Sequence, residues 1–219
     1  MPRAVFIRWL ESYQQAKEPA VKIGILDLFD RVKNISSTTD EGLLTGLDFD
    51  PNDTALEKLE SLIAELRAAV FLHETGFTDI KLIPKMKKKK SYDISTKFGN
   101  ENFIVEVACL TKTHSRKKLT GVDAYLLDTD KFKATLKDIA EKKKNQLNIN
   151  GASYRALLIF VLNRSPEVEL YNFAEYRKFI ESLYSQLAWG QGYYLGFVTG
   201  TENFIYPTIQ FLNEPACSS

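Results

Sequence analysis

The chain has 219 residues, a net charge of +1 and a hydrophobic content of 44%, which fits one globular domain or one domain with an extension. No apolar run reaches the roughly 18 residues that span a bilayer, and two cysteines do not make a disulfide framework. Two histidines without a Cys-x-x-Cys pair disfavour a zinc site. These features together favour a cytoplasmic protein that does not act in a membrane.

The first third of the chain is expected to be mostly helical. Helical spacing of apolar residues predicts three helices, over about residues 4–17, 19–32 and 54–75. Pro19 suits the first turn of the second helix, Asn52 or Asp53 can cap the third, and Gly76 ends it. Residues 34–52 are rich in Ser, Thr, Asp and Gly, and they predict a loop or linker.

Short β signals alternate with helices in the rest of the chain. Strands are predicted over about residues 78–83, 92–98, 102–110, 156–162, 193–198 and 204–211, and helices over about 131–147 and 172–188. Gly99-Asn100 marks a hairpin turn between the second and third strands. This order predicts an α/β fold with a mixed central β-sheet flanked by helices. Residues 1–50 would be a helical extension and linker, and residues 51–219 the main domain.

Glu106 is the most informative position, because it places a carboxylate inside an apolar strand. A buried charge is costly unless something compensates it, and a bound metal ion would do so. Asp93 on the neighbouring strand supplies a second ligand. If the turn pairs Phe98 with Phe103, Asp93 and Glu106 are diagonal neighbours on one face of the sheet, and Lys97 points to the same face. The pattern predicts a metal-dependent site.

Further residues extend this pattern: Glu65 in the third helix, Gly76-Phe77 at its end, Asp93, and the segment Ile104-Val-Glu-Val-Ala108. This set resembles the PD-(D/E)XK nuclease superfamily, also called restriction-endonuclease-like, and the resemblance covers residues 54–162. It implies a restriction-endonuclease-like fold and a metal-dependent endonuclease that cleaves phosphodiester bonds of DNA with magnesium, or with manganese in its place. It also implies a set of metal ligands: Glu65, Asp93, Glu106 and the carbonyl of Val107.

Ala108 departs from the family pattern, which has a catalytic lysine two residues after the strand glutamate. Lys97 is the first candidate to replace it, because the assumed pairing directs Lys97 to the same face as Glu106. Lys143 or Lys144 on a later helix is the second. Without a replacement, metal could still bind while catalysis weakens or disappears. The alternative is therefore a catalytically inactive nuclease-fold protein that binds nucleic acid or a protein partner.

Clusters of lysine suggest where nucleic acid would bind. The candidates are Lys87, Lys88, Lys89 and Lys90 before Asp93, together with Lys143 and Gln146, whose Lys-x-x-Gln spacing is common in the family. The same lysines could instead form solvated surface, Glu65 could be a solvated helix residue, and Glu106 could pair with Lys97 in a purely structural protein. The N-terminal helices could serve packing, homodimerisation or target recognition.

Overall fold

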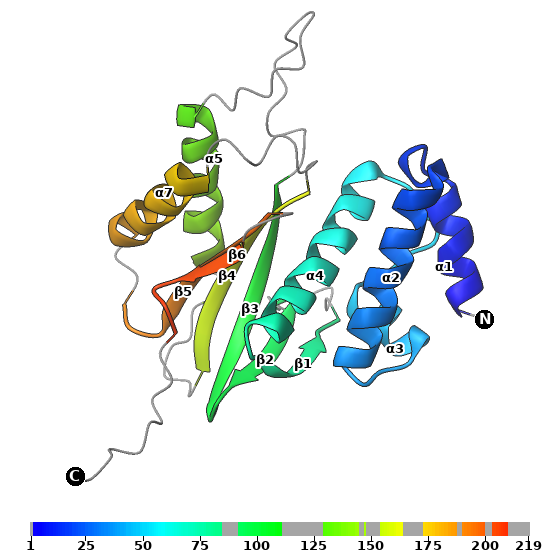
Figure 1. Ribbon diagram of the computed structural model, residues 1–219, viewed down its shortest axis with the longest axis horizontal. Coiled ribbons are helices and arrows are strands. Elements are labelled where there is room, and N and C mark those ends of the chain that lie inside the picture. The colour runs from blue at the N-terminus through cyan, green and yellow to red at the C-terminus, as the bar shows by residue number, and fades with distance from the viewer. Residues whose placement is uncertain are drawn as a thin grey trace, which may run out of the picture.

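Six strands form one mixed β-sheet in the order β1-β2-β3-β4-β5-β6 (Figure 1). The computed structural model describes residues 2–84, 92–110, 129–144, 147, 154–163, 173–187, 190–199 and 203–209. The strands are β1 (Thr78–Leu82), β2 (Ile94–Phe98), β3 (Glu101–Leu110), β4 (Tyr154–Leu162), β5 (Tyr193–Val198) and β6 (Asn203–Tyr206). β1, β2 and β3 are antiparallel, β3, β4 and β5 run parallel, and β6 returns antiparallel to β5.

Helices cover both faces of this sheet. The helices are α1 (Pro2–Glu11), α2 (Pro19–Ile35), α3 (Asp40–Gly46), α4 (Leu56–Glu74), α5 (Thr129–Lys144) and α7 (Phe173–Gln186), with a short 3-10 turn η1 (Gln15–Lys17). α5 and α7 join the parallel strands and lie on one face, whereas α4 lies on the other face with α1, α2 and α3 outside it (Figure 1). The prediction of an α/β fold with a mixed sheet flanked by helices is confirmed. No helix in the described part of the chain has both the length and the apolar character needed to cross a membrane.

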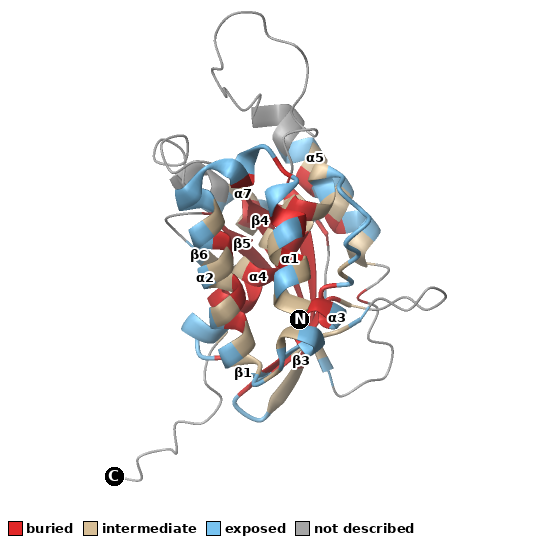
Figure 2. Cartoon of the chain, turned by 90° about the vertical axis from the view of Figure 1, so that its right-hand side faces the viewer, coloured by how far each residue is buried: buried red, intermediate tan, exposed pale blue. Residues whose placement is uncertain are grey.

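α4 is buried on most of its surface, as Figure 2 shows, because the sheet lies on one side of it and the N-terminal helices on the other. Phe6 of α1 and Phe29 of α2 stack with ring centroids 4.8 Å apart, and they belong to the same hydrophobic core as Leu66 of α4 and Val105 of β3. Residues 1–50 therefore share a core with the sheet. This packing explains how a charged residue of α4 can lie far from solvent.

The predicted loop over residues 34–52 is wrong in part, because it contains the helix α3. Thr39 caps this helix, since its side chain accepts a hydrogen bond from the N–H of Gly42 at 3.1 Å. Leu43 and Leu44 are buried in the core. Two leucines among polar residues were thus enough to hold one short helix against the rest of the protein.

The hairpin between β2 and β3 has a different register from the assumed one. Phe98 pairs with Glu101, so Gly99 and Asn100 form a two-residue turn. Gly99 has a φ of +57°, and a glycine with positive φ at the first central position suits such a turn. The assumed pairing of Phe98 with Phe103 is wrong by two residues. A shift of two keeps every side chain on its expected face, but it changes which residues are neighbours.

The side chains of β3 alternate between two hydrophobic cores. Val105 and Val107 belong to the core on the α4 side, and Ile104 and Ala108 belong to the core that contains residues of α5 and α7. Glu106 has the parity of Ile104 and Ala108, so it points to the face that α5 and α7 cover.

Candidate active site

Asp93 lies where the pairing of β2 with β3 ends, one residue before Ile94. The N–H of Asp93 donates to the carbonyl of Val105 at 3.0 Å, and the N–H of Val107 donates to Oδ2 of Asp93 at 2.8 Å. The carboxylate thus takes the place that a backbone carbonyl of β2 would occupy if the ladder continued. Because Val105 and Val107 flank Glu106, these two bonds fix Asp93 beside Glu106.

Glu106 is deeply buried and paired with a lysine of a distant element. Its exposed fraction is 2% and that of Asp93 is 4%. The Nζ of Lys143, in the last turn of α5, forms an ion pair with Oε1 of Glu106. The Lys143 side chain is 28% exposed, so its stem lies against the protein while its head compensates the buried charge.

Ala108 is buried on the same face as Glu106, in the core that includes Leu136 and Ala140 of α5. Ala140 precedes Lys143 by three residues, so both lie on one side of the helix. Ala108 and Ala140 therefore belong to one core on the side of the sheet where Lys143 meets Glu106. Of the two predicted replacements for the family's strand lysine, the second, Lys143, is the one that contacts Glu106.

Lys97 does not lie at the site. It sits opposite Asn102 in the observed register, and its Nζ pairs with Asp79 of β1 at 2.7 Å. At about 3.3 Å per residue, Lys97 is about 13 Å along the strand from Asp93. The assumed register had directed Lys97 toward Glu106, and the register of the two-residue hairpin separates them. The alternative of a Glu106–Lys97 pair is replaced by the pair with Lys143.

Glu65 is 4% exposed, so the alternative of a solvated helix residue is wrong. It lies on α4, across the sheet from α5 (Figure 1). Burial raises the pKa of the Cys109 thiol of β3 to about 12, and the charges of Glu60 and Glu65 on α4 add to this rise. Among the described residues, no three His, Cys, Asp or Glu side chains are grouped to hold a metal ion. Asp93 and Glu106 come together, but Glu65 does not complete a triad with them.

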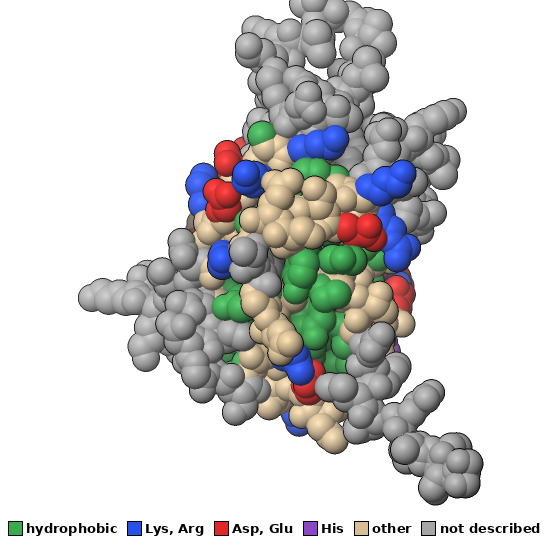
Figure 3. All heavy atoms as spheres, turned by 90° about the vertical axis from the view of Figure 1, so that its left-hand side faces the viewer, with side chains coloured by type: hydrophobic (Ala, Val, Ile, Leu, Met, Phe, Trp, Pro, Cys, Tyr) green, Lys and Arg blue, Asp and Glu red, His purple; other side chains and the backbone are tan. Residues whose placement is uncertain are grey.

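The predicted nucleic-acid contacts fall mostly in segments that are not described. Lys87, Lys88, Lys89, Lys90 and Gln146 lie outside the described residues. Lys143 is turned inward to Glu106, and Lys144 donates to the carbonyl of Leu187 at 3.0 Å. Figure 3 shows the face with α5 and α7, where Lys, Arg, Asp and Glu side chains lie around a central hydrophobic area.

Arg67 lies on the largely buried helix α4, and its contacts were not predicted from the sequence. It donates to the carbonyl of Leu162 at 2.8 Å and to Oδ1 of Asn163 at 2.9 Å, and it also donates to the carbonyl of Thr199. These acceptors lie at the carboxyl ends of β4 and β5, so Arg67 ties α4 to both strands only two residues after Glu65. An arginine inside the apolar stripe of the predicted helix was the available signal.

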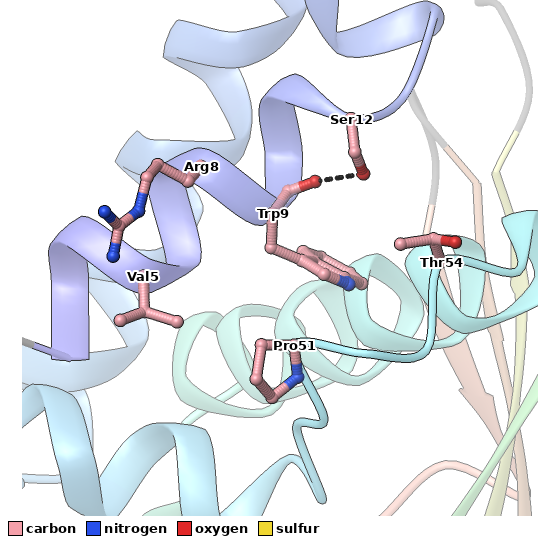
Figure 4. A pocket seen from close by; sticks show the side chains of 6 residues that line it. All are labelled: Val5, Arg8, Trp9, Ser12, Pro51 and Thr54. Carbon is pink, nitrogen blue, oxygen red and sulfur yellow. Dashed lines mark hydrogen bonds between the residues drawn. The ribbon is translucent and has the colours of Figure 1, made fainter.

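A surface pocket of about 240 Å³ lies apart from the carboxylates. Its lining residues come from α1 and the segment before α4, as Figure 4 shows: Val5, Arg8, Trp9, Ser12, Pro51 and Thr54. The indole N–H of Trp9 donates to the carbonyl of Asp53 at 2.8 Å, which fixes the ring in the core rather than toward a ligand. The pocket carries no buried charged group, and we do not assign it to the site.

Comparisons of the chain with protein-family models, with curated proteins and with solved structures give no match.

Proposed function

We propose that this chain is a magnesium-dependent nuclease with a restriction-endonuclease-like fold, acting on DNA phosphodiester bonds in the cytoplasm. One observation carries the proposal: Asp93 is hydrogen-bonded to both strand neighbours of Glu106, so two buried acidic residues are neighbours, and Lys143 forms an ion pair with one of them. The mixed sheet flanked by helices is compatible with that fold.

The residues at this place fit magnesium. This ion prefers oxygen ligands and is commonly held by one or two carboxylates together with waters and substrate phosphate oxygens. Asp93 and Glu106 would supply the carboxylates. Val107 would supply its carbonyl, which in an extended strand points to the same side as the N–H that binds Asp93. A bound magnesium ion would supply charge neutralisation of the phosphate and a more acidic water.

Lys143 takes the role that the family gives to the strand lysine. Its ammonium lies at the site, in an ion pair with Glu106, and it would stabilise negative charge that develops on the phosphate during cleavage. In this proposal Ala108 does not prevent catalysis, because the positive charge comes from Lys143 of α5 and not from a lysine of β3. The net charge of only +1 means that DNA binding would depend on local lysine clusters such as residues 87–90, and would weaken with salt.

A second candidate is a non-cleaving protein of the same fold that binds nucleic acid or a protein partner. The specific observation that favours it is the ion pair itself, since Lys143 compensates the charge of Glu106 without any metal. Such a protein would bind DNA through its lysines and leave the phosphodiester bonds intact.

Cleavage of a DNA panel separates the two candidates. The full chain is incubated with magnesium or manganese and with single-stranded, double-stranded and branched DNA. We expect cleavage by the wild type and none by Asp93→Asn or Glu106→Gln. Glu101→Gln is the matched control, because Glu101 lies on the same strand but pairs with Arg155 at a partly exposed position.

The fold of each variant is checked by thermal unfolding before activity is compared. DNA binding without cleavage by the wild type would support the non-cleaving candidate. Equal loss of activity in Glu101→Gln would mean that the assay reports on stability and not on the site.

A further inference from the structure

We propose that Lys143 competes with metal for Glu106. In the metal-free protein its ammonium holds the buried carboxylate, and when a metal is bound there Lys143 moves away from Glu106 toward the substrate phosphate. This inference rests on the proposed metal site, and it adds that Glu106 exchanges Lys143 for the metal ion when the metal binds.

The burial of Glu106 is the first reason. An ionised carboxylate that is 2% exposed needs a positive partner, because an uncompensated buried charge is strongly unfavourable. Lys143 provides that partner in the structure as it stands. A divalent cation at the same carboxylate would provide it instead, and two cations side by side would repel each other.

The mobility of the two partners is the second reason. Glu106 lies on β3, which pairs with β4 from Asn102 to Leu110 and with β2 up to Val105, the residue before Glu106. Lys143 lies one residue before the end of α5, and its side chain is 28% exposed. The flexible stem of a lysine can swing its head group without a change in the backbone. The exchange therefore moves Lys143 and leaves the carboxylates in place.

The two neighbouring lysines give matched controls. Lys144 donates to a backbone carbonyl, that of Leu187, and Lys142 is exposed. Neither forms a described ion pair with Glu106, so Lys142→Met and Lys144→Met remove the same charge from α5 without removing the competitor.

The test measures manganese binding to the full chain by isothermal titration calorimetry, with thermal unfolding as a second readout. Lys143→Met should unfold at a lower temperature without metal, because Glu106 loses its partner. It should bind manganese about tenfold or more tightly than the wild type, with a larger rise in unfolding temperature on metal addition. Lys142→Met and Lys144→Met should bind like the wild type, within about threefold.

Lys143→Arg provides a second variant in case Lys143→Met does not fold. A guanidinium grips a carboxylate through two hydrogen bonds, so Lys143→Arg should bind manganese about threefold or more weakly than the wild type. The expected order of manganese affinity, from tight to weak, is Lys143→Met, wild type, Lys143→Arg. If the wild type binds metal but the affinities do not follow this order, this inference alone is overturned. No metal binding by the wild type or by Lys143→Met would overturn the proposed metal site and this inference with it.

Discussion

Replacing Arg67 with methionine should destabilise the protein by about 2–4 kcal/mol. Arg67 donates to three acceptors at the carboxyl ends of β4 and β5: the carbonyls of Leu162 and Thr199, and the side chain of Asn163. A hydrogen bond to a charged group contributes ~1.5–3 kcal/mol. The three bonds share one guanidinium and are not additive, so the loss is smaller than three times that value. Methionine keeps most of the aliphatic part of the arginine side chain, so the loss of stability reports on the hydrogen bonds.

Urea unfolding followed by circular dichroism measures this difference in the free energy of unfolding. Arg31→Met is the matched control, because Arg31 forms an exposed ion pair with Glu74 at 2.7 Å, and such a pair contributes ~0.2–1 kcal/mol. Arg67→Lys should fall between the wild type and Arg67→Met, since the single nitrogen of an ammonium replaces the two guanidinium nitrogens that bind these acceptors. If Arg67→Met were no less stable than Arg31→Met, water would be satisfying the acceptors and the reasoning would be refuted.

Three further predictions concern the N-terminal helices. Gly46→Ala should destabilise by ~1–3 kcal/mol, because the new Cβ would lie 2.8 Å from Cβ of Leu82. Gly24→Ala should stabilise by ~0.5–1 kcal/mol, because residue 24 is exposed and nothing lies within 4 Å of its Cβ position. Thermal unfolding compares the two variants. The hydrogen bond from Arg3 lowers the pKa of Asp30. The stabilisation is therefore present above the ordinary aspartate pKa and lost as pH falls through the lowered one. Asp30→Asn should remove that acid dependence, and an unchanged pH profile of stability would contradict it.

Elements with strong local signals were predicted from the sequence within a few residues. β5 spans Tyr193–Val198 as predicted, and α2 begins at Pro19, whose fixed φ suits a first helical turn. α3 was missed because it depends on non-local burial of Leu43 and Leu44 and on one cap. Its residues are polar enough to resemble a loop when they are read without the core against which they pack.

The site was predictable in part. Burial of Glu106 and its proximity to Asp93 followed from the apolar strand and the hairpin signal, and both survive the two-residue change of register because side-chain parity is kept. The preference for Lys97 over Lys143 was wrong, because it depended on the assumed register. Lys97 was favoured by a register that the sequence could not fix, whereas Lys143 is 37 residues from Glu106. Such a contact depends on how α5 packs on the sheet.

Ala108 and Lys143 are best understood together. Ala108 is buried within the apolar core beside α5 and pairs in register with Phe160. A lysine at 108 would have to place its stem in that core and its ammonium near Lys143, where two like charges would compete for Glu106. The helix lysine and the strand lysine are therefore alternative solutions to one requirement, a single cation beside a buried carboxylate. Ala108→Lys should accordingly be tolerated better with Lys143→Met than with Lys143 present. A double variant less stable than Ala108→Lys alone would show that the two positions do not share this role.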